Sequence, residues 1–206
     1  MTTVYLSVGA NIGDRAGNIR RAIEALGGHV PAPSDTGLGP VLSGTGRSPA
    51  PFGTARSRTP IGMGRGMRVR RVSSLYETEP VELRDQPWFL NSVVEAETEL
   101  LPQQVMDALL EIERGMGRER RVPKGPRLID MDILLFGSSV VQTTGLEIPH
   151  PRMAQRRFVL APFAEIAPGV QHPILKKTIA ELLAETADRS EVRKWVEGDL
   201  TTGERR

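Results

Sequence analysis

Apolar and polar positions alternate in several parts of the chain, and this alternation predicts β-strands. Residues 3–8 read TVYLSV, with β-branched and aromatic side chains in a pattern of period two that stops at Gly9. Residues 69–78 and 89–98 show the same strand-favouring composition and are separated by an acidic connection that contains proline. Residues 128–136 form a further apolar segment of strand length. The chain therefore contains at least four candidate strands.

Three other segments repeat their apolar residues every three or four positions, which predicts amphipathic helices. The first spans residues 15–26, with Asp14 as its N-cap and a pair of glycines after its end. The second opens at Pro102, a residue favoured in the first turn of a helix, and the third covers residues 177–186. The apolar positions on the first two faces are Ile19, Ala22, Ile23 and Leu26, then Val105, Leu109, Ile112 and Met116.

The elements follow the order strand, helix, strand, strand, helix, strand. This order is typical of the ferredoxin-like split βαβ arrangement, an α+β fold with a mainly antiparallel sheet and helices packed on one face. We expect residues 1–206 to form a single domain, whose mixed acidic and basic tail frays after residue 188. The fold class alone does not determine function, because it serves binding proteins and enzymes alike.

Glycine and proline are concentrated in residues 29–70, where they make up 14 of 42 residues. Such a composition buries too little apolar surface to offset the entropy of ordering the backbone, so we expect a disordered insertion there. The segment also carries six arginines against one aspartate, which leaves the rest of the chain mildly acidic. The formal net charge of +2 is too small to indicate nucleic-acid binding.

The chain has no cysteine, which excludes disulfide scaffolds, thiol catalysis and cysteine-ligated zinc. It also lacks an apolar run of about 18 residues, the length needed to span a membrane, and its first residues lack the basic region of a signal peptide. We therefore expect a cytoplasmic, monomeric protein with no membrane or nucleic-acid partner.

Two aspartates stand out on the apolar segment 128–136. Residues two apart on a strand share a face, so Asp130 and Asp132 project together while Met131 and Ile133 point into a core. Paired carboxylates repel each other unless a cation lies between them, and hard oxygen ligands suit Mg²⁺. A solvated strand end is the alternative for an isolated Asp-x-Asp. Here the neighbouring sequence favours the metal.

That neighbouring sequence is a basic loop rich in glycine and proline. Arg118, Arg120, Arg121, Lys124 and Arg127 precede the aspartates. Guanidinium forks on such a loop are suited to bind a polyphosphate, and the loop to act as a lid. A solvated basic face or an RNA-binding patch could explain the arginines alone. Phosphate and divalent metal together require both the arginines and the carboxylates.

Two further groups are candidate binding residues. His150 lies between two prolines, which restrict it, and could donate to a phosphate together with Arg156. Phe89 and Asn91 share a face of their strand, where an aromatic ring beside an amide suits a planar heterocycle with mixed donors and acceptors. A core aromatic beside a turn-forming asparagine is the alternative. No P-loop, Gly-x-Gly-x-x-Gly, Gly-x-Ser-x-Gly or His-Glu-x-x-His motif occurs.

Six motifs in order resemble the 6-hydroxymethyl-7,8-dihydropterin pyrophosphokinase family of folate biosynthesis. They are Val8 to Gly13, Ser73 to Thr78, Asp85 to Asn91, Ile112-Glu113 with Gly117-Arg118, Gly125-Pro126-Arg127 with Asp130 to Leu134, and Ile148 to Met153 with Arg156 and Phe158. The resemblance covers nearly the whole chain outside residues 29–70. It implies transfer of diphosphate from ATP to the pterin hydroxymethyl group with release of AMP.

The resemblance also implies roles for individual residues. Asp130 and Asp132 would hold two Mg²⁺ ions. Arg118, Arg127, His150 and Arg156 would bind the ATP phosphates, with Arg118 and Arg127 catalytic, and Thr78, Phe89, Asn91 and Phe158 would hold the pterin. Lys124 stands before Gly-Pro-Arg, where several family members carry a tryptophan, and is a further candidate for the pterin side.

Two alternative functions come from other classes. A ferredoxin-like RNA-binding module would use the arginine loops with Phe89 as a stacking platform. The lack of RNP-type motifs, the aromatic content of 4% and the two aspartates argue against it. A catalytically inactive homologue acting as an interaction protein is the second alternative, and the intact acidic and arginine sets argue against that.

Overall fold

The computed structural model describes residues 1–27, 66–81, 85–117 and 126–196. Within them a six-stranded antiparallel sheet has the order β5-β1-β4-β3-β8, with β2 also paired to β4. The strands are β1 (Thr2–Ala10), β2 (Met67–Val72), β3 (Tyr76–Thr78), β4 (Phe89–Thr98), β5 (Asp130–Phe136) and β8 (Val192–Lys194). Of the predicted strands, residues 89–98 match β4, and 3–8 and 128–136 match β1 and β5 within a few residues.

The sheet confirms the predicted α+β fold. The strand β4 lies between β1 and β2, which α1 (Arg15–Ala25) separates in the sequence, and β1 lies between β4 and β5, which α2 (Pro102–Gly115) separates. These are two interleaved split βαβ units. Asp14 caps α1 as predicted, since its side chain accepts a hydrogen bond from the Gly17 amide at 2.9 Å.

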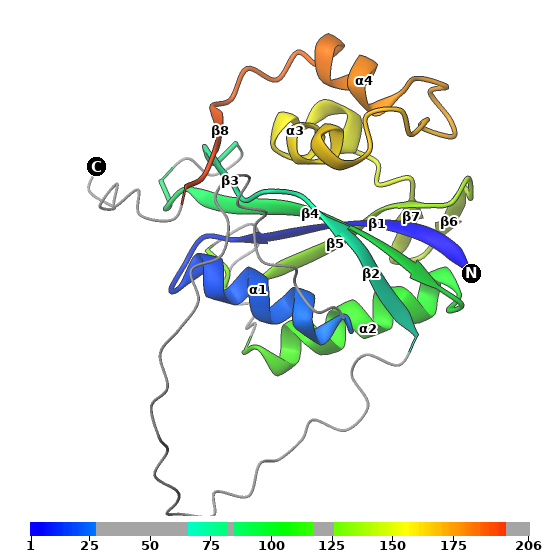
Figure 1. Cartoon of the computed structure of the whole chain (residues 1–206), viewed down its shortest axis with the longest axis horizontal. Helices are drawn as coiled ribbons and strands as arrows, with labels where there is room; N and C mark the ends of the chain where they lie inside the picture. Colours follow the sequence, from blue (N-terminus) through cyan, green and yellow to red (C-terminus); the bar gives the residue numbers. More distant parts are fainter. Residues whose placement is uncertain (28–65, 82–84, 118–125, 197–206) are drawn as a thin grey trace, which may run out of the picture.

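Helices cover both faces of the sheet, not one face as predicted (Figure 1). Two of them, α1 and α2, lie on one side, and α3 (Arg157–Ile166) and α4 (Ile179–Glu185) lie on the other. The reason is that the central strands are buried on both faces. Val94 packs in the core below the sheet, whereas its neighbour Val93 packs with Phe163 of α3 in a second core above it.

The segment predicted as one strand, residues 69–78, is two strands. Ser73 lies between them: its amide donates to the Val93 carbonyl at 2.9 Å, but its side-chain oxygen, not its carbonyl, accepts from the Val93 amide at 2.9 Å. The first of them, β2, begins at Met67, which pairs with Thr98. The predicted insertion at 29–70 therefore extends too far, because residues 67–70 belong to the sheet. Its residues 29–65 lie outside the described part of the chain.

The predicted fraying after residue 188 is also wrong as far as residue 196. Residues 192–194 form β8, an edge strand that pairs with β3 (Figure 1). Its side chains hold it there through ion pairs from Arg193 to Glu77 and from Lys194 to Glu165. A small hairpin, β6 (Val141–Thr143) and β7 (Leu146–Ile148), and a short 3₁₀ helix at Met153–Gln155 complete the described structure.

No helix in the described ranges is both long enough and apolar enough to cross a membrane.

Candidate active site

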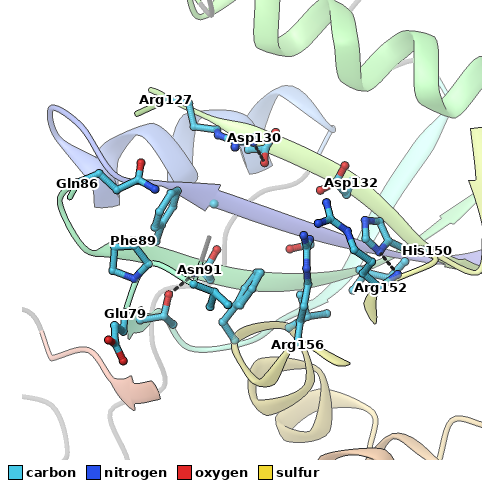
Figure 2. Close-up of a pocket in the computed structure, with 18 residues that line it drawn as sticks. Glu79, Gln86, Phe89, Asn91, Arg127, Asp130, Asp132, His150, Arg152 and Arg156 are labelled. Carbon is cyan, nitrogen blue, oxygen red and sulfur yellow. Dashed lines mark hydrogen bonds and ion pairs between the residues drawn. The ribbon is translucent and has the colours of Figure 1, made fainter. Parts of the chain in front are cut away.

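A pocket of about 350 Å³ lies against β1, β3, β4 and β5, where the segment at residues 150–159 closes one side (Figure 2). Nine predicted site residues line it. They are Thr78, Phe89, Asn91, Arg127, Asp130, Asp132, His150, Arg156 and Phe158. The other two, Arg118 and Lys124, lie outside the described residues. The structure therefore brings predicted site residues from four separate motifs to one cavity.

The acidic side of the pocket is built on β5. Asp130 pairs with Gly9 and Asp132 with Ser7 of β1, and both carboxylates border the cavity (Figure 2). Met131, between them, is only 4% exposed and points into the core, as the alternation predicts. The buried carboxylate of Glu113 on α2 accepts a hydrogen bond from the Met131 amide at 2.7 Å. This bond fixes the strand between the two aspartates.

On the acidic side of the pocket, Arg127 is held through both its side chain and its backbone. The Arg127 guanidinium forms an ion pair with the Asp130 carboxylate. The backbone of Arg127 makes two hydrogen bonds to Asn11. Its amide donates to the side-chain Oδ1 of Asn11 at 2.8 Å, and its carbonyl accepts from the backbone amide of Asn11 at 3.2 Å. Asn11 is buried and also donates to Gln86 Oε1 at 3.1 Å. One asparagine thus links Arg127 to Gln86, which also lines the pocket.

His150 presents a neutral imidazole to the pocket. Burial, together with the positive charges of Arg156 and Arg152, lowers the pKa of His150 from 6.5 to about 4. Its Nδ1 accepts a hydrogen bond from the Arg152 amide at 3.2 Å, so the proton of the neutral ring is on Nε2. His150 is therefore a hydrogen-bond donor through Nε2 and carries no charge at neutral pH.

Arg152 and Arg156 form a basic group beside His150 and Asp132 (Figure 2). The Arg156 guanidinium lies 5.4 Å from the centre of the Phe158 ring, a cation–π contact that orients both side chains. The sequence predicted Arg156 but did not assign Arg152. The signal that could have identified Arg152 is its place two residues after His150, within the same motif.

The opposite wall is aromatic and amide-lined. Asn91 Nδ2 donates to Thr78 Oγ1 at 2.7 Å, and both residues are buried. Gly9 packs so closely that a Cβ atom there would lie 2.5 Å from Asn91 Oδ1. The rings of Phe89 and Phe158 line the same pocket. Gln86 and Glu79 also line it and were not predicted, although Gln86 lies in a motif that the sequence analysis quoted.

The donor set fits a magnesium ion that is completed by substrate oxygens. Within the described ranges no group of three or more His, Cys, Asp or Glu side chains could hold a metal. Two carboxylates on one strand face are nevertheless a sufficient protein contribution for Mg²⁺, which keeps water and phosphate oxygens in its shell. Asp130 and Asp132 are the residues that could hold it.

Comparison with known proteins determines the family. The family model for 7,8-dihydro-6-hydroxymethylpterin-pyrophosphokinase (HPPK) matches residues 55–168, more than half of the chain. The chain belongs to the HPPK family. This confirms the resemblance drawn from the motifs. As an HPPK family member, the chain is a pyrophosphokinase of folate biosynthesis.

Curated relatives match this HPPK chain over nearly its full length. The 2-amino-4-hydroxy-6-hydroxymethyldihydropteridine pyrophosphokinase of Bacillus subtilis is 36% identical over 191 residues, which are 93% of this chain and 89% of the relative. The enzyme of the same name from Aquifex aeolicus is 33% identical over 185 residues, 90% of this chain and 92% of the relative.

Solved structures support the HPPK fold. A crystal structure of HPPK-DHPS in complex with substrates aligns with a TM-score of 0.56 at 13% identity, over 89% of this chain. The wild-type HPPK-DHPS of Plasmodium falciparum aligns with a TM-score of 0.57, also at 13% identity. The present chain spans 43% and 44% of those two chains. At such identity the likeness concerns the fold alone.

Proposed function

We propose that this enzyme transfers the diphosphate of ATP to the hydroxymethyl group of 6-hydroxymethyl-7,8-dihydropterin and releases AMP, as a cytoplasmic monomer. The observation that carries the proposal is the division of one pocket into two chemically distinct sides. Carboxylates, arginines and a neutral histidine line one side, and aromatic rings with an amide line the other. The first side suits a metal-bound polyphosphate and the second a planar heterocycle.

Asp130 and Asp132 are the proposed ligands of two Mg²⁺ ions. When bound, the ions neutralise charge on the attacking and leaving oxygens. The ion pair between Arg127 and Asp130 places a guanidinium suited to phosphate beside a carboxylate suited to Mg²⁺. In the proposed complex, Arg127 would bind a phosphate oxygen while its backbone stays anchored to Asn11.

The proposed phosphate-binding residues are Arg127, His150 and Arg156, together with Arg118 of the basic loop. Arginine forks match phosphate oxygens in charge and geometry. His150 contributes a different kind of contact, because its neutral ring donates one hydrogen bond from Nε2. A donor without charge orients a phosphate group without adding to the repulsion between the two neighbouring arginines.

The proposed pterin site is formed by Thr78, Asn91, Phe89 and Phe158, with Lys124 as a further candidate. The bond from Asn91 to Thr78 fixes the amide, so that Asn91 Oδ1 and Thr78 Oγ1 are presented in set positions. Two aromatic rings provide faces for a flat heterocycle. The buried polar pair gives specificity, since a ligand that lacks matching groups leaves it unpaired.

The reaction requires little covalent chemistry from the protein. The pterin hydroxyl oxygen attacks the β-phosphorus, the bond from that phosphorus to the α–β bridging oxygen breaks, and AMP leaves with that oxygen. The hydroxyl proton passes to solvent or phosphate. The protein holds the two substrates in line and excludes water, and such positioning lowers the activation free energy by about 7–11 kcal/mol.

The test is a product assay with Mg²⁺, ATP and the pterin alcohol. We expect AMP to form only when all three are present, and EDTA to abolish it. Asp132→Asn keeps the size of the side chain but removes a metal ligand, so we expect activity to fall at least about a hundredfold with unchanged folding. ADP as the product, or full activity in Asp132→Asn, would contradict the proposal.

A further inference from the structure

We propose that Arg15, Glu77 and Arg193 form a positioning unit on the far side of the sheet from Thr78 and the proposed pterin site. Through this unit the C-terminal strand β8 sets the affinity for the pterin. The inference rests on the proposed function. None of the three side chains lines the pocket. They act through Thr78 and Phe89, which do.

Glu77 is a buried carboxylate held between two arginines. Its side chain is only 6% exposed. Arg15 of α1 donates to Glu77 Oε1 at 2.9 Å, and Arg193 of β8 donates to Glu77 Oε2 through Nε at 3.1 Å and through a second nitrogen. Burial raises the pKa of Glu77, but the hydrogen bonds from Arg193 and Arg15 outweigh burial, and the net pKa is lowered. The carboxylate is therefore charged at neutral pH and engaged at both oxygens.

The positioning unit contacts the residues next to Thr78 and Phe89 of the proposed pterin site. Successive side chains of a strand point to opposite faces of the sheet, so the Thr78 side chain is on the pocket face and the Glu77 side chain is on the other face. Arg15 also donates to the Trp88 carbonyl at 2.7 Å, and the Arg193 guanidinium lies 5.3 Å from the centre of the Trp88 ring. Trp88 immediately precedes Phe89 of the pocket. The two arginines thus fix the residues next to both Thr78 and Phe89.

The strand β8 supplies one of these arginines from the end of the described chain. It pairs only with β3 among the described strands, with Val192 opposite Thr78 and Arg193 opposite Glu77 (Figure 1). A strand of three residues gains little from its own backbone pairing. The bonds from Arg193 to Glu77 add side-chain contacts to this pairing, and neither residue lines the pocket.

The experiment measures steady-state kinetics for both substrates in Arg193→Gln, beside direct binding of the pterin followed by its fluorescence. We expect the KM and Kd for the pterin to rise about tenfold, the size of effect typical for loss of hydrogen bonds to a charged partner. The KM for ATP and kcat stay within about twofold, because the phosphate side is untouched. Arg193→Lys keeps the charge and restores most of the affinity.

Lys194→Gln is the matched control. Lys194 lies next to Arg193 on β8, is similarly exposed, and pairs at 3.0 Å with Glu165 on α3. We expect its pterin KM to equal that of the wild type. An unchanged pterin KM in Arg193→Gln, equal rises in both KM values, or the same effect in Lys194→Gln would overturn the inference. AMP release by the wild type tests the proposed function separately: its absence overturns both, whereas an active wild type with an unaffected variant overturns only the positioning unit.

Discussion

Adding one methyl group at Gly9 should weaken pterin binding without removing any functional group. The Cβ atom of Gly9→Ala would lie 2.5 Å from Asn91 Oδ1 and 3.6 Å from Asn91 Cγ. Such an approach is closer than atoms pack in folded proteins, so the Asn91 side chain must move. Asn91 is 5% exposed and bonded to Thr78 at 2.7 Å, so we expect its displacement to weaken or break that bond.

The expected size of the effect follows from this displacement. Losing a buried hydrogen bond and leaving its partner unsatisfied costs about 1–3 kcal/mol, and overpacking costs a similar amount. We therefore expect the free energy of unfolding to fall by about 1–3 kcal/mol. Because Asn91 and Thr78 are the proposed contacts for the pterin edge, the same change should raise the Kd for the pterin about ten- to hundredfold.

The assay compares pterin binding, ATP binding and urea unfolding in Gly9→Ala and in a control. Gly169→Ala is the matched control, because a Cβ atom there meets nothing within 4 Å. We expect Gly169→Ala to bind both ligands as the wild type does. Wild-type affinity for the pterin in Gly9→Ala would refute the reasoning. An equal loss of ATP affinity would also refute it, because the added methyl group crowds Asn91 and not the proposed phosphate-binding residues.

Two further predictions concern stability. His150 has a pKa lowered from 6.5 to about 4 in the folded state, so protonation of the unfolded chain lowers the free energy of unfolding as the pH falls from 6.5 towards 4. We expect the wild type to lose up to about 3 kcal/mol relative to His150→Gln over this range, as measured by urea unfolding at several pH values. Phe163 is fully buried, with its ring centre 4.7 Å from that of Tyr5. Phe163→Ala should cost about 3–5 kcal/mol of unfolding free energy, with little change in either KM. A pH-independent difference, or a cost below about 1 kcal/mol, would contradict these two expectations.

Much of the fold follows from local patterns. Residues 89–98 have the composition of a strand and lie at the centre of the sheet, and the helix at residues 15–26 has both an apolar face and an N-cap. The pairing of Asp130 with Asp132 on one face needed only the period of a strand. These features depend on neighbours in sequence, so the sequence predicts them.

The features that were missed depend on partners distant in sequence. The strand β8 reads VRK and has no alternation of its own; its pairing with β3 and its ion pairs with Glu77 and Glu165 hold it as a strand. Helices on the second face require knowing that β4 is buried on both sides. Arg152 reaches the pocket because the segment from His150 onward closes one side of it, and the position of Arg152 two residues after His150 was the one hint of this in the sequence.

The most direct test of the central claim follows the β-phosphorus of ATP. The enzyme is incubated with Mg²⁺, the pterin alcohol and ATP labelled at the β-phosphorus, and the products are separated. If the pocket aligns the pterin hydroxyl with that atom, the label moves quantitatively into the pterin product and unlabelled AMP remains. Label retained in ADP, with only the γ-phosphate on the pterin, would contradict the account.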